Sequence, residues 1–415
     1  MSKKVKKYIS ENWDKCIKYN PNDDGTLIGL PYPYTVPAVG HFDEIYYWDT
    51  YFTNVGLIID GRAEQTKYNV DDMLYLVNRY GYMPNGNRTY YLNRSQPPFL
   101  SCMVRDVYEY YKDMAWLFSA YEMLKKEYEF WQTKRCSDMG LNHYDDDGKL
   151  SEDEYRDIAA GCANRTGLNP DIPTHDLVRH YMSNCESGWD MNPRWDYDGY
   201  NFAAVDLNSL LFMMENNMKF FADELKNGEA RIWSECAERR RVLMLEKMDN
   251  GEGLLLDYNF VTGKQSKIFS AASFYPLFAG LAEKRHAEAL VKNLHRLEAE
   301  YGILTCEKND AEGAFQWDYP NGWACLQYIA IVGLDKYGYT EEAKRIAEKY
   351  IRLADKVFDE TGNLWEKYDV VNGSVVVGCE YETPPMMGWS AGVYLAALNH
   401  HLGNAKFNYL HNAEK

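Results

Sequence analysis

The sequence predicts an all-α fold in which helices alternate between the inner and outer layers of a closed toroid. Two kinds of helical segment support this prediction. Residues 205–225 carry one apolar stripe at three- and four-residue spacing, which is typical of an outer, half-exposed helix. Residues 323–334 are apolar nearly all round, so this helix must be surrounded by protein. An α/α toroid needs such alternation, because each inner helix is walled by neighbours and covered by an outer partner.

The 415 residues are expected to form one domain, residues 1–415. Roughly the first 25 residues are expected to form a leading helix and about the last 10 a tail. Residues 271–282 are predicted to form a second inner helix, and residues 287–297 an outer one. A further outer helix is expected to begin after Thr340, an N-cap residue, and to stop at Gly362.

Aromatic stretches rich in Gly, Pro and Asn separate these helices. Because a toroid gathers such loops at one mouth, and loops on a rigid scaffold often carry functional groups, these stretches are where a site is expected. They are residues 28–52, 82–99, 184–201, 315–323 and 363–389.

Composition and charge exclude several classes of partner. Lys and Arg total 45 against 62 Asp and Glu, and the net charge of −17 repels nucleic acids and anionic membrane surfaces. We find no run of roughly 18 apolar residues, the length that a membrane span requires. The N-terminus shows no apolar export signal, and the nine cysteines form no close CxxC pair. A cytoplasmic location with reduced thiols is therefore expected, and the oligomeric state is left open.

Two aromatic stretches have the mixed chemistry that a sugar ring requires. The first, GHFDEIYYWDTYF, places stacking rings beside Asp49. The second, PNGNRTYYLNRSQPP, offers Arg94 and Gln96 as donors to hydroxyl oxygens. The alternatives are an aromatic core segment with a capping Asp, and a solvated loop.

The stretch ESGWDMNPRW places Asp190 between two tryptophans. An apolar environment raises the pKa of a carboxyl group, which would make Asp190 a general acid. Asp190 could equally cap a helix or pair with Arg194.

Two later stretches add platforms and carboxylates. FQWDYPNGW offers two tryptophans and a turn that enters a buried helix. LWEKYDV and GCEYETPPMMGW contribute Glu366 and Glu380, both flanked by aromatic residues. Either glutamate could be a general base.

Taken together and in order, these motifs resemble those of glycoside hydrolase family 37, the α,α-trehalases. The family signatures are similar to residues 42–52 and 316–323, and the resemblance runs from about residue 30 to about residue 400. It implies an (α/α)6 barrel without a metal or cofactor, in which Asp190 is the general acid and Glu366 the general base. It also implies sugar subsites lined by Phe42, Trp48, Asp49, Asn85, Arg94, Gln96, Glu186, Trp189, Trp317 and Glu380.

The activity implied by the resemblance is inverting, exo-acting hydrolysis of an α-glucosidic bond, with trehalose as the expected substrate. Asp190 would protonate the glycosidic oxygen while Glu366 takes a proton from the attacking water. The two carboxyl groups should then lie roughly 6.5–9.5 Å apart, which leaves room for that water. The expected partner is a small oligosaccharide or glucoside.

Two departures from the family pattern keep alternatives open. His41 stands where trehalases have arginine, and the segment 172–181 lacks their Arg-Pro-Glu-Ser-Tyr pattern, although Arg179 lies in it. Such changes could redirect specificity at the second-sugar subsite. One alternative is a family 63-like α-glycosidase that acts on another α-glucoside or α-mannoside. The other is a sugar-binding protein without activity, and a histidine-dependent isomerase is disfavoured.

Overall fold

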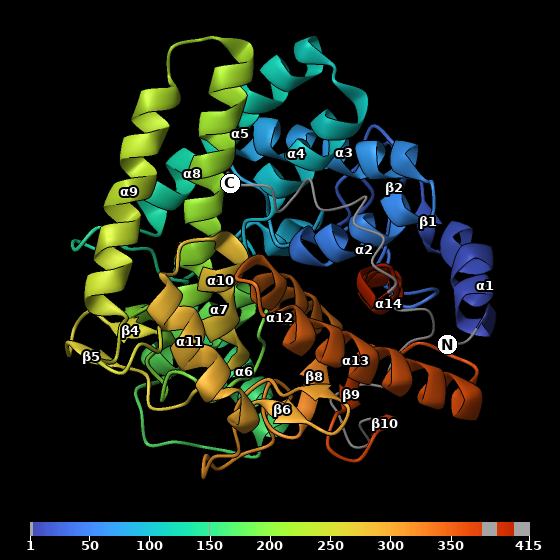
Figure 1. The fold of residues 1–415 in the computed structure, drawn as a ribbon. Helices are drawn as coiled ribbons and strands as arrows, with labels where there is room; N and C mark the ends of the chain where they lie inside the picture. Colours follow the sequence, from blue (N-terminus) through green and yellow to red (C-terminus); the bar gives the residue numbers. More distant parts are fainter. Residues whose placement is uncertain (1–2, 149, 376–387, 402–415) are drawn as a thin grey trace.

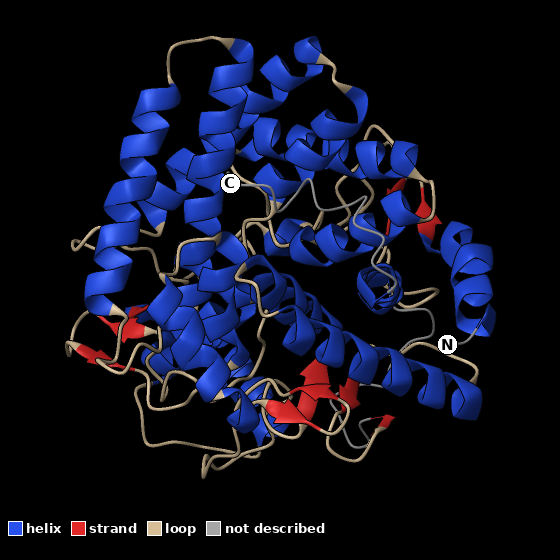
Figure 2. Ribbon diagram, viewed as in Figure 1, coloured by secondary structure: helices blue, strands red, loops and turns tan. Residues whose placement is uncertain are grey.

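The computed structural model describes residues 3–148, 150–375 and 388–401. Figures 1 and 2 show that helices dominate this part of the chain and that the strands are short and peripheral. None of the helices described is long and apolar enough to cross a membrane. The predicted all-α class is confirmed.

Six helices form an inner ring in which each packs against the next, and the last packs against the first (Figure 1). The close contact between the last and the first brings residues from the two ends of the chain together. The toroid predicted from the sequence is therefore confirmed. In ring order the helices are α2 (Tyr47–Ile59), α4 (Leu100–Tyr111), α8 (Val205–Leu225), α10 (Tyr275–Ala279), α12 (Ala324–Lys336) and α14 (Gly388–His401).

The outer helices cover this ring. α3 packs on α2 and α4, α5 on α4 and α8, α9 on α8, and α13 on α12 and α14. α1 joins the outer layer through Tyr8, whose ring lies 5.0 Å from Phe358 of α13. The outer helices are α1 (Lys3–Asn12), α3 (Ala63–Tyr80), α5 (Met114–Lys134), α9 (Ala230–Lys247), α11 (Lys284–Lys292) and α13 (Thr340–Thr361).

The prediction that residues 205–225 form an outer helix is wrong, because α8 belongs to the inner ring. Its polar residues suggested an exposed face, but many of them are buried with partners. Asn208 donates to the backbone oxygen of Asn142 at 2.8 Å, and Glu215 pairs with Arg240 at 2.9 Å. Buried polar groups whose hydrogen bonds are satisfied can occupy a core face. The inner positions of residues 271–282 and 323–334 are confirmed.

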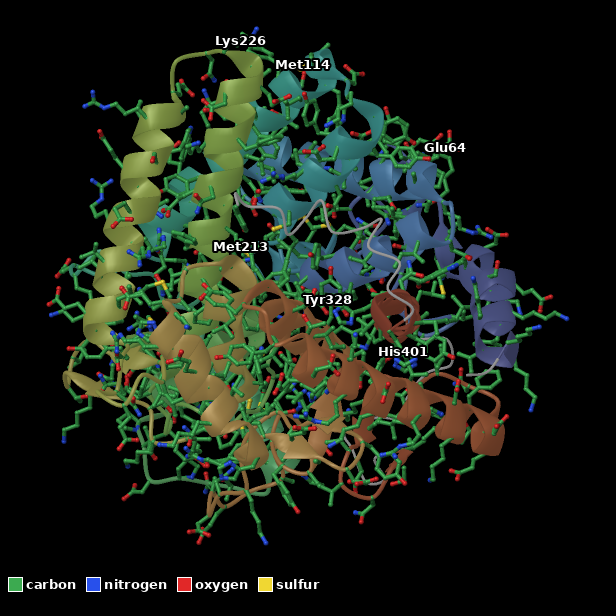
Figure 3. All side chains as sticks on the ribbon, in the orientation of Figure 1. Glu64, Met114, Met213, Lys226, Tyr328 and His401 are labelled. Atoms are coloured by element: carbon green, nitrogen blue, oxygen red, sulfur yellow. The ribbon has the colours of Figure 1, made fainter. Side chains whose placement is uncertain are left out.

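Aromatic side chains fill the centre of the ring. Tyr51 stacks on Phe99 at 4.5 Å, and Tyr328 lies 5.9 Å from Phe52 and 6.2 Å from Phe278. Figure 3 shows Tyr328 near the middle of the molecule. The ring axis is therefore filled by side chains at this level.

Short elements connect the helices. α6 (Glu152–Thr166) and α7 (Thr174–Ser187) pack together and share a small apolar cluster separate from the main core. Every strand pair is antiparallel, in the orders β1-β2, β3-β4-β5, β6-β7 and β10-β9-β8. The strands are β1 (Ile17–Lys18), β2 (Tyr34–Thr35), β3 (Phe202–Ala203), β4 (Tyr258–Asn259), β5 (Lys264–Gln265), β6 (Glu298–Ala299), β7 (Gly302–Ile303), β8 (Asn321–Trp323), β9 (Lys367–Asp369) and β10 (Ser374–Val375).

The 3-10 helices are η1 (Trp13–Cys16), η2 (Thr89–Tyr91), η3 (Gly199–Asn201), η4 (Ala271–Phe274) and η5 (Leu294–Arg296). At the N-terminus, the leading helix ends at Asn12, and η1 and β1 follow it.

Candidate active site

Five tryptophans from four of the predicted loop stretches meet at the N-terminal ends of inner helices. Trp317 is central, because its ring lies parallel to that of Trp323 at 3.7 Å and stacks on Trp189 at 5.4 Å. Trp48 lies 5.6 Å and Trp389 6.4 Å from the same ring. Gln96, from the fifth stretch, accepts a hydrogen bond from the Trp48 backbone at 3.3 Å. The five stretches therefore do meet at one mouth.

Asp190 follows directly on Trp189, just beyond the C-terminal end of α7, and is partly exposed. The helix ends at Gly188 in the left-handed region, with φ 73°. A Cβ at this position would lie 2.6 Å from the Trp48 ring. Only glycine therefore allows the chain to turn here with its backbone packed on the Trp48 ring, two residues before Asp190.

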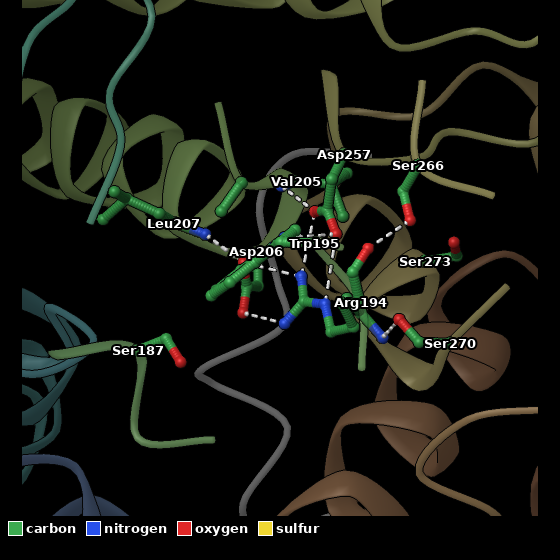
Figure 4. A network of polar contacts seen from close by, with 12 residues as sticks. Ser187, Arg194, Trp195, Val205, Asp206, Leu207, Asp257, Ser266, Ser270 and Ser273 are labelled. Carbon is green, nitrogen blue, oxygen red and sulfur yellow. Dashed lines mark hydrogen bonds and ion pairs between the residues drawn. The ribbon is translucent and has the colours of Figure 1, made fainter. Parts of the chain in front are cut away.

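Arg194, a buried cation, anchors the loop that carries Asp190 (Figure 4). The Arg194 guanidinium is fully buried and bridges Asp206 at 3.2 Å and Asp257 at 2.9 Å. It also lies 4.3 Å from the Trp189 ring. Arg194 therefore pairs with Asp206 and Asp257, whereas the sequence alone had left open a pairing with Asp190. Arg194 thus fixes the tryptophan that precedes Asp190 against α8 and β4.

Glu186 has a different environment from the one expected of a sugar-binding residue. Its side chain has no exposed surface and pairs with Arg135 at 2.7 Å. It also accepts hydrogen bonds from the backbone N–H groups of Ser95 and Asp145, both at 2.8 Å. Through its bond to Ser95, Glu186 therefore supports the backbone of the loop that carries Gln96.

Glu366 lies next to β9, and its residue is buried to 5 % exposure. Its backbone oxygen accepts a hydrogen bond from the Trp389 indole at 3.1 Å, which ties it to α14. Its carboxylate accepts a hydrogen bond from Lys367 at 2.9 Å. Sequence reasoning did not single out Lys367, although it follows Glu366 directly.

Asp49 lies in the first turn of α2 and interacts electrostatically with both candidate catalytic residues. Burial, together with the charges of Glu366 and Asp190, raises the pKa of Asp49 to about 8. Charges act on one another in this way only over short distances inside a protein. The three carboxylates therefore lie close together at one mouth of the toroid.

Of the remaining predicted residues, Asn85 lies at the start of α2, where its backbone oxygen accepts a hydrogen bond from the Tyr47 N–H at 3.0 Å. Arg94 donates to the Asn85 side chain at 3.1 Å and lies 5.0 Å over the Tyr91 ring. Phe42 is partly buried, 5.6 Å from the Tyr46 ring. Glu380 lies outside the described residues.

The two departures from the family pattern differ in their surroundings. His41 is exposed and lies 4.7 Å from the Phe42 ring. Arg179 pairs with Asp145 through two hydrogen bonds, at 2.8 and 2.5 Å, and lies over Tyr200. Its guanidinium is thus already engaged. Near this segment, a hollow of about 440 Å³ is lined by side chains that include Pro193, Tyr197 and Phe315.

Comparisons with known proteins identify the family of this chain. The family model "Trehalase" matches residues 1–402. The periplasmic trehalase of Xanthomonas campestris is 33 % identical over 95 % of this chain and 73 % of its own length. The periplasmic trehalase of Pseudomonas aeruginosa is also 33 % identical, over 94 % of this chain and 75 % of its own.

Solved structures show the same fold. Neutral trehalase Nth1 from Saccharomyces cerevisiae superposes with a TM-score of 0.77 at 29 % identity, covering 98 % of this chain and 82 % of its own. The mannosylglycerate hydrolase of family 63 from Thermus thermophilus reaches 0.66 at 17 % identity, over 94 % and 99 % of the two chains. The second likeness concerns the fold alone.

The comparisons also correct one expectation. The cytoplasmic location inferred from the N-terminus and the cysteines is contradicted, because these curated relatives are named periplasmic trehalases. The match to the family model over nearly the whole chain and the identity to curated relatives establish the family. The chain is a member of the trehalase family of glycoside hydrolases.

Proposed function

We propose that this protein hydrolyses α,α-trehalose to two glucose molecules with inversion at the attacked carbon. The observation that carries the proposal is the carboxyl cluster at one mouth of the toroid, where Glu366 and Asp190 both raise the pKa of the buried Asp49 beside the rings of Trp48 and Trp317. The proteins that this chain matches over most of its length are named trehalases. The ring of inner helices is closed by the contact between α14 and α2, which come from the two ends of the chain. We therefore propose that the chain works as one catalytic domain.

Asp190 is the general acid in this proposal. It directly follows the buried Trp189 and the glycine that packs on the Trp48 ring, and apolar surroundings favour the protonated form of a carboxyl group. Its proton passes to the glycosidic oxygen as the bond to the departing glucose breaks.

Glu366 is the general base. It takes a proton from the water that attacks the anomeric carbon from the opposite face, so the attacked sugar leaves as β-glucose. The departing sugar keeps its α configuration. The separation between the two carboxyl groups should fall in the range of roughly 6.5–9.5 Å that inverting enzymes use.

The surrounding residues bind and orient the sugars. The rings of Trp48 and Trp317 offer faces for stacking, and Arg94, Asn85 and Gln96 offer hydrogen bonds to hydroxyl groups. Glu186 is proposed to act indirectly, by holding the backbone at Ser95, because its own carboxylate is buried and paired with Arg135.

The test follows the anomers of glucose released from trehalose by proton NMR. Equal amounts of α- and β-glucose at early times are expected from the wild type. Asp190→Asn and Glu366→Gln should each lower kcat at least about 100-fold, because proton transfer is lost at constant shape. Asp196→Asn, which changes an exposed carboxylate of the same loop, should keep normal activity.

A substrate panel separates trehalose hydrolysis from the family 63-like alternative. Trehalose, kojibiose, maltose, glucosylglycerate and mannosylglycerate are supplied in parallel, and the released sugar is measured. Preference for mannosylglycerate would overturn the trehalose assignment but keep the catalytic pair. Binding of trehalose without turnover of any substrate would favour a sugar-binding protein.

A further inference from the structure

Lys367 is a buried cation that contacts the proposed general base directly. Its side chain is 1 % exposed, and Nζ donates to Oε2 of Glu366 at 2.9 Å. Nζ also donates to the side-chain oxygen of Gln316 at 3.1 Å and lies 5.0 Å from the Trp323 ring. A lysine is rarely buried unless it is paired, so this position has a specific partner.

Two sequence motifs meet to build this contact. β8 pairs with β9 in a register that sets Trp323 opposite Lys367. The backbone oxygen of Gln316 accepts hydrogen bonds from the Asn321 amide at 2.9 Å and the Trp323 indole at 3.3 Å. The stretch 316–323 therefore folds into a rigid holder whose side-chain oxygen and indole ring receive the ammonium group of Lys367.

Ionisable groups from several elements lie around Glu366. Asp49 on α2 bears on Glu366, and Asp190 beyond α7 bears on Asp49. Cys325 on α12 is buried and interacts with both Asp49 and Glu366. Nearby acidic groups favour the protonated form of a carboxyl group, whereas an ammonium in contact favours the ionised form. Burial raises the pKa of both Asp49 and Cys325, so both are uncharged at neutral pH. Lys367, from β9, is the charged side chain in direct contact with the Glu366 carboxylate.

We propose that Lys367 is a positioning residue that keeps Glu366 ionised and fixes the rotation of its carboxylate toward the nucleophilic water. The inference rests on the proposed function, in which Glu366 is the general base. Lys367 itself touches neither the sugar nor the water. Lys367 thereby lets Glu366 act as the base at a pH at which the general acid, Asp190, is still protonated.

The test measures kcat/KM for trehalose against pH in Lys367→Met, Lys367→Gln and Lys367→Arg. In the two neutral variants the acid limb of the profile should move up by about one to two pH units, because the ammonium no longer favours the carboxylate. On the acid limb, below the wild-type midpoint, this gives a loss of about 10- to 100-fold in kcat/KM. In Lys367→Arg the charge remains, and the acid limb should stay within about half a pH unit.

Lys349→Met is the matched control. Lys349 bridges Glu298 at 2.8 Å and the backbone oxygen of Ala299 at 2.7 Å, on the outer helix α13. Its loss should change the melting temperature without moving the pH profile. If Lys367→Met does not fold, Lys367→Gln carries the comparison.

The outcomes separate this inference from the function on which it rests. If Glu366→Gln is inactive but the acid limb of both neutral variants coincides with that of the wild type, the role of Lys367 is refuted and the base remains. If Glu366→Gln keeps full activity, the proposed base itself is wrong. A neutral variant that loses activity equally at every pH would show that Lys367 has only a structural role.

Discussion

Asp49 is the residue whose ionisation differs most clearly from its usual state near the proposed catalytic pair. Burial and the charges of Glu366 and Asp190 raise its pKa to about 8. Asp49 therefore carries a proton at neutral pH and can donate a hydrogen bond to a sugar hydroxyl. A neutral acid beside two working carboxylates also avoids a third negative charge in the mouth.

The raised pKa of Asp49 has a measurable consequence for stability. Between pH 4 and pH 8 the folded chain holds this proton while the unfolded chain releases it, so Asp49 makes the fold less stable as the pH rises. Asp49→Asn removes this effect. The free energy of unfolding of Asp49→Asn, relative to that of the wild type, should rise by roughly 4–5 kcal/mol from pH 4 to pH 8.

Chemical unfolding at several pH values measures the difference. Asp43→Asn serves as control, since Asp43 is exposed and pairs with Lys18. A constant difference between Asp49→Asn and the wild type across this range would contradict the raised pKa.

At the residue scale, the sequence predicted the residues that carry local signals. Asp190 and Glu366 stand between aromatic residues, and the structure brings the loops that carry them together. The buried environment of Glu186 was not predictable, because its partner Arg135 lies 51 residues earlier and has no signal of its own. Long-range pairing of this kind is set by the fold and not by local pattern.

At the scale of elements, the loop that carries Asp190 depends on Arg194. This arginine lies between Asp206 and Asp257 with no exposed surface. Arg194→Met leaves two carboxylates buried without their cation, which should cost about 3–5 kcal/mol in the free energy of unfolding. Activity should fall as well, because Trp189 loses the group that it packs on.

Arg345→Met is the matched control for Arg194→Met. Arg345 makes two hydrogen bonds of 2.8 Å to Glu298, but its side chain is 46 % exposed. An exposed pair of this kind contributes about 1 kcal/mol or less. Urea unfolding of the two variants compares them directly, and equal losses would show that burial does not set the importance of Arg194.

Element assignment from sequence succeeded where side chains obey one pattern and failed where polar residues are buried. α12 is apolar all round and α13 has a single stripe, so each was placed in the correct layer. α8 has the stripe of an outer helix but lies in the inner ring, because Asn208 and Glu215 find partners on other segments. Hydrophobic pattern alone cannot show that a polar face is satisfied inside a core.

At the scale of the whole molecule, the ring closes through an unusually close approach of α2 and α14. A Cβ at Gly392 would lie 2.1 Å from the backbone oxygen of Phe52, and a Cβ at Gly56 would lie 2.4 Å from the Cα of Gly392. Glycines at both positions thus let the two backbones touch. These helices also carry Trp48 and Asp49 on one side and Trp389 on the other, so closure of the ring and assembly of the mouth are coupled.

Gly392→Ala tests this coupling against the general preference of helices for alanine. An isolated replacement of glycine by alanine inside a helix stabilises it by roughly 0.5–1 kcal/mol. At Gly392 the added methyl group must push α14 away from α2, so we expect a loss of about 1–3 kcal/mol and a lower kcat. Gly161→Ala, in the exposed helix α6 where a Cβ meets nothing within 4 Å, should instead raise the melting temperature and leave kcat unchanged. If both variants are stabilised alike, close contact at the two glycines does not hold the ring shut, and the mouth must be positioned by the loops alone.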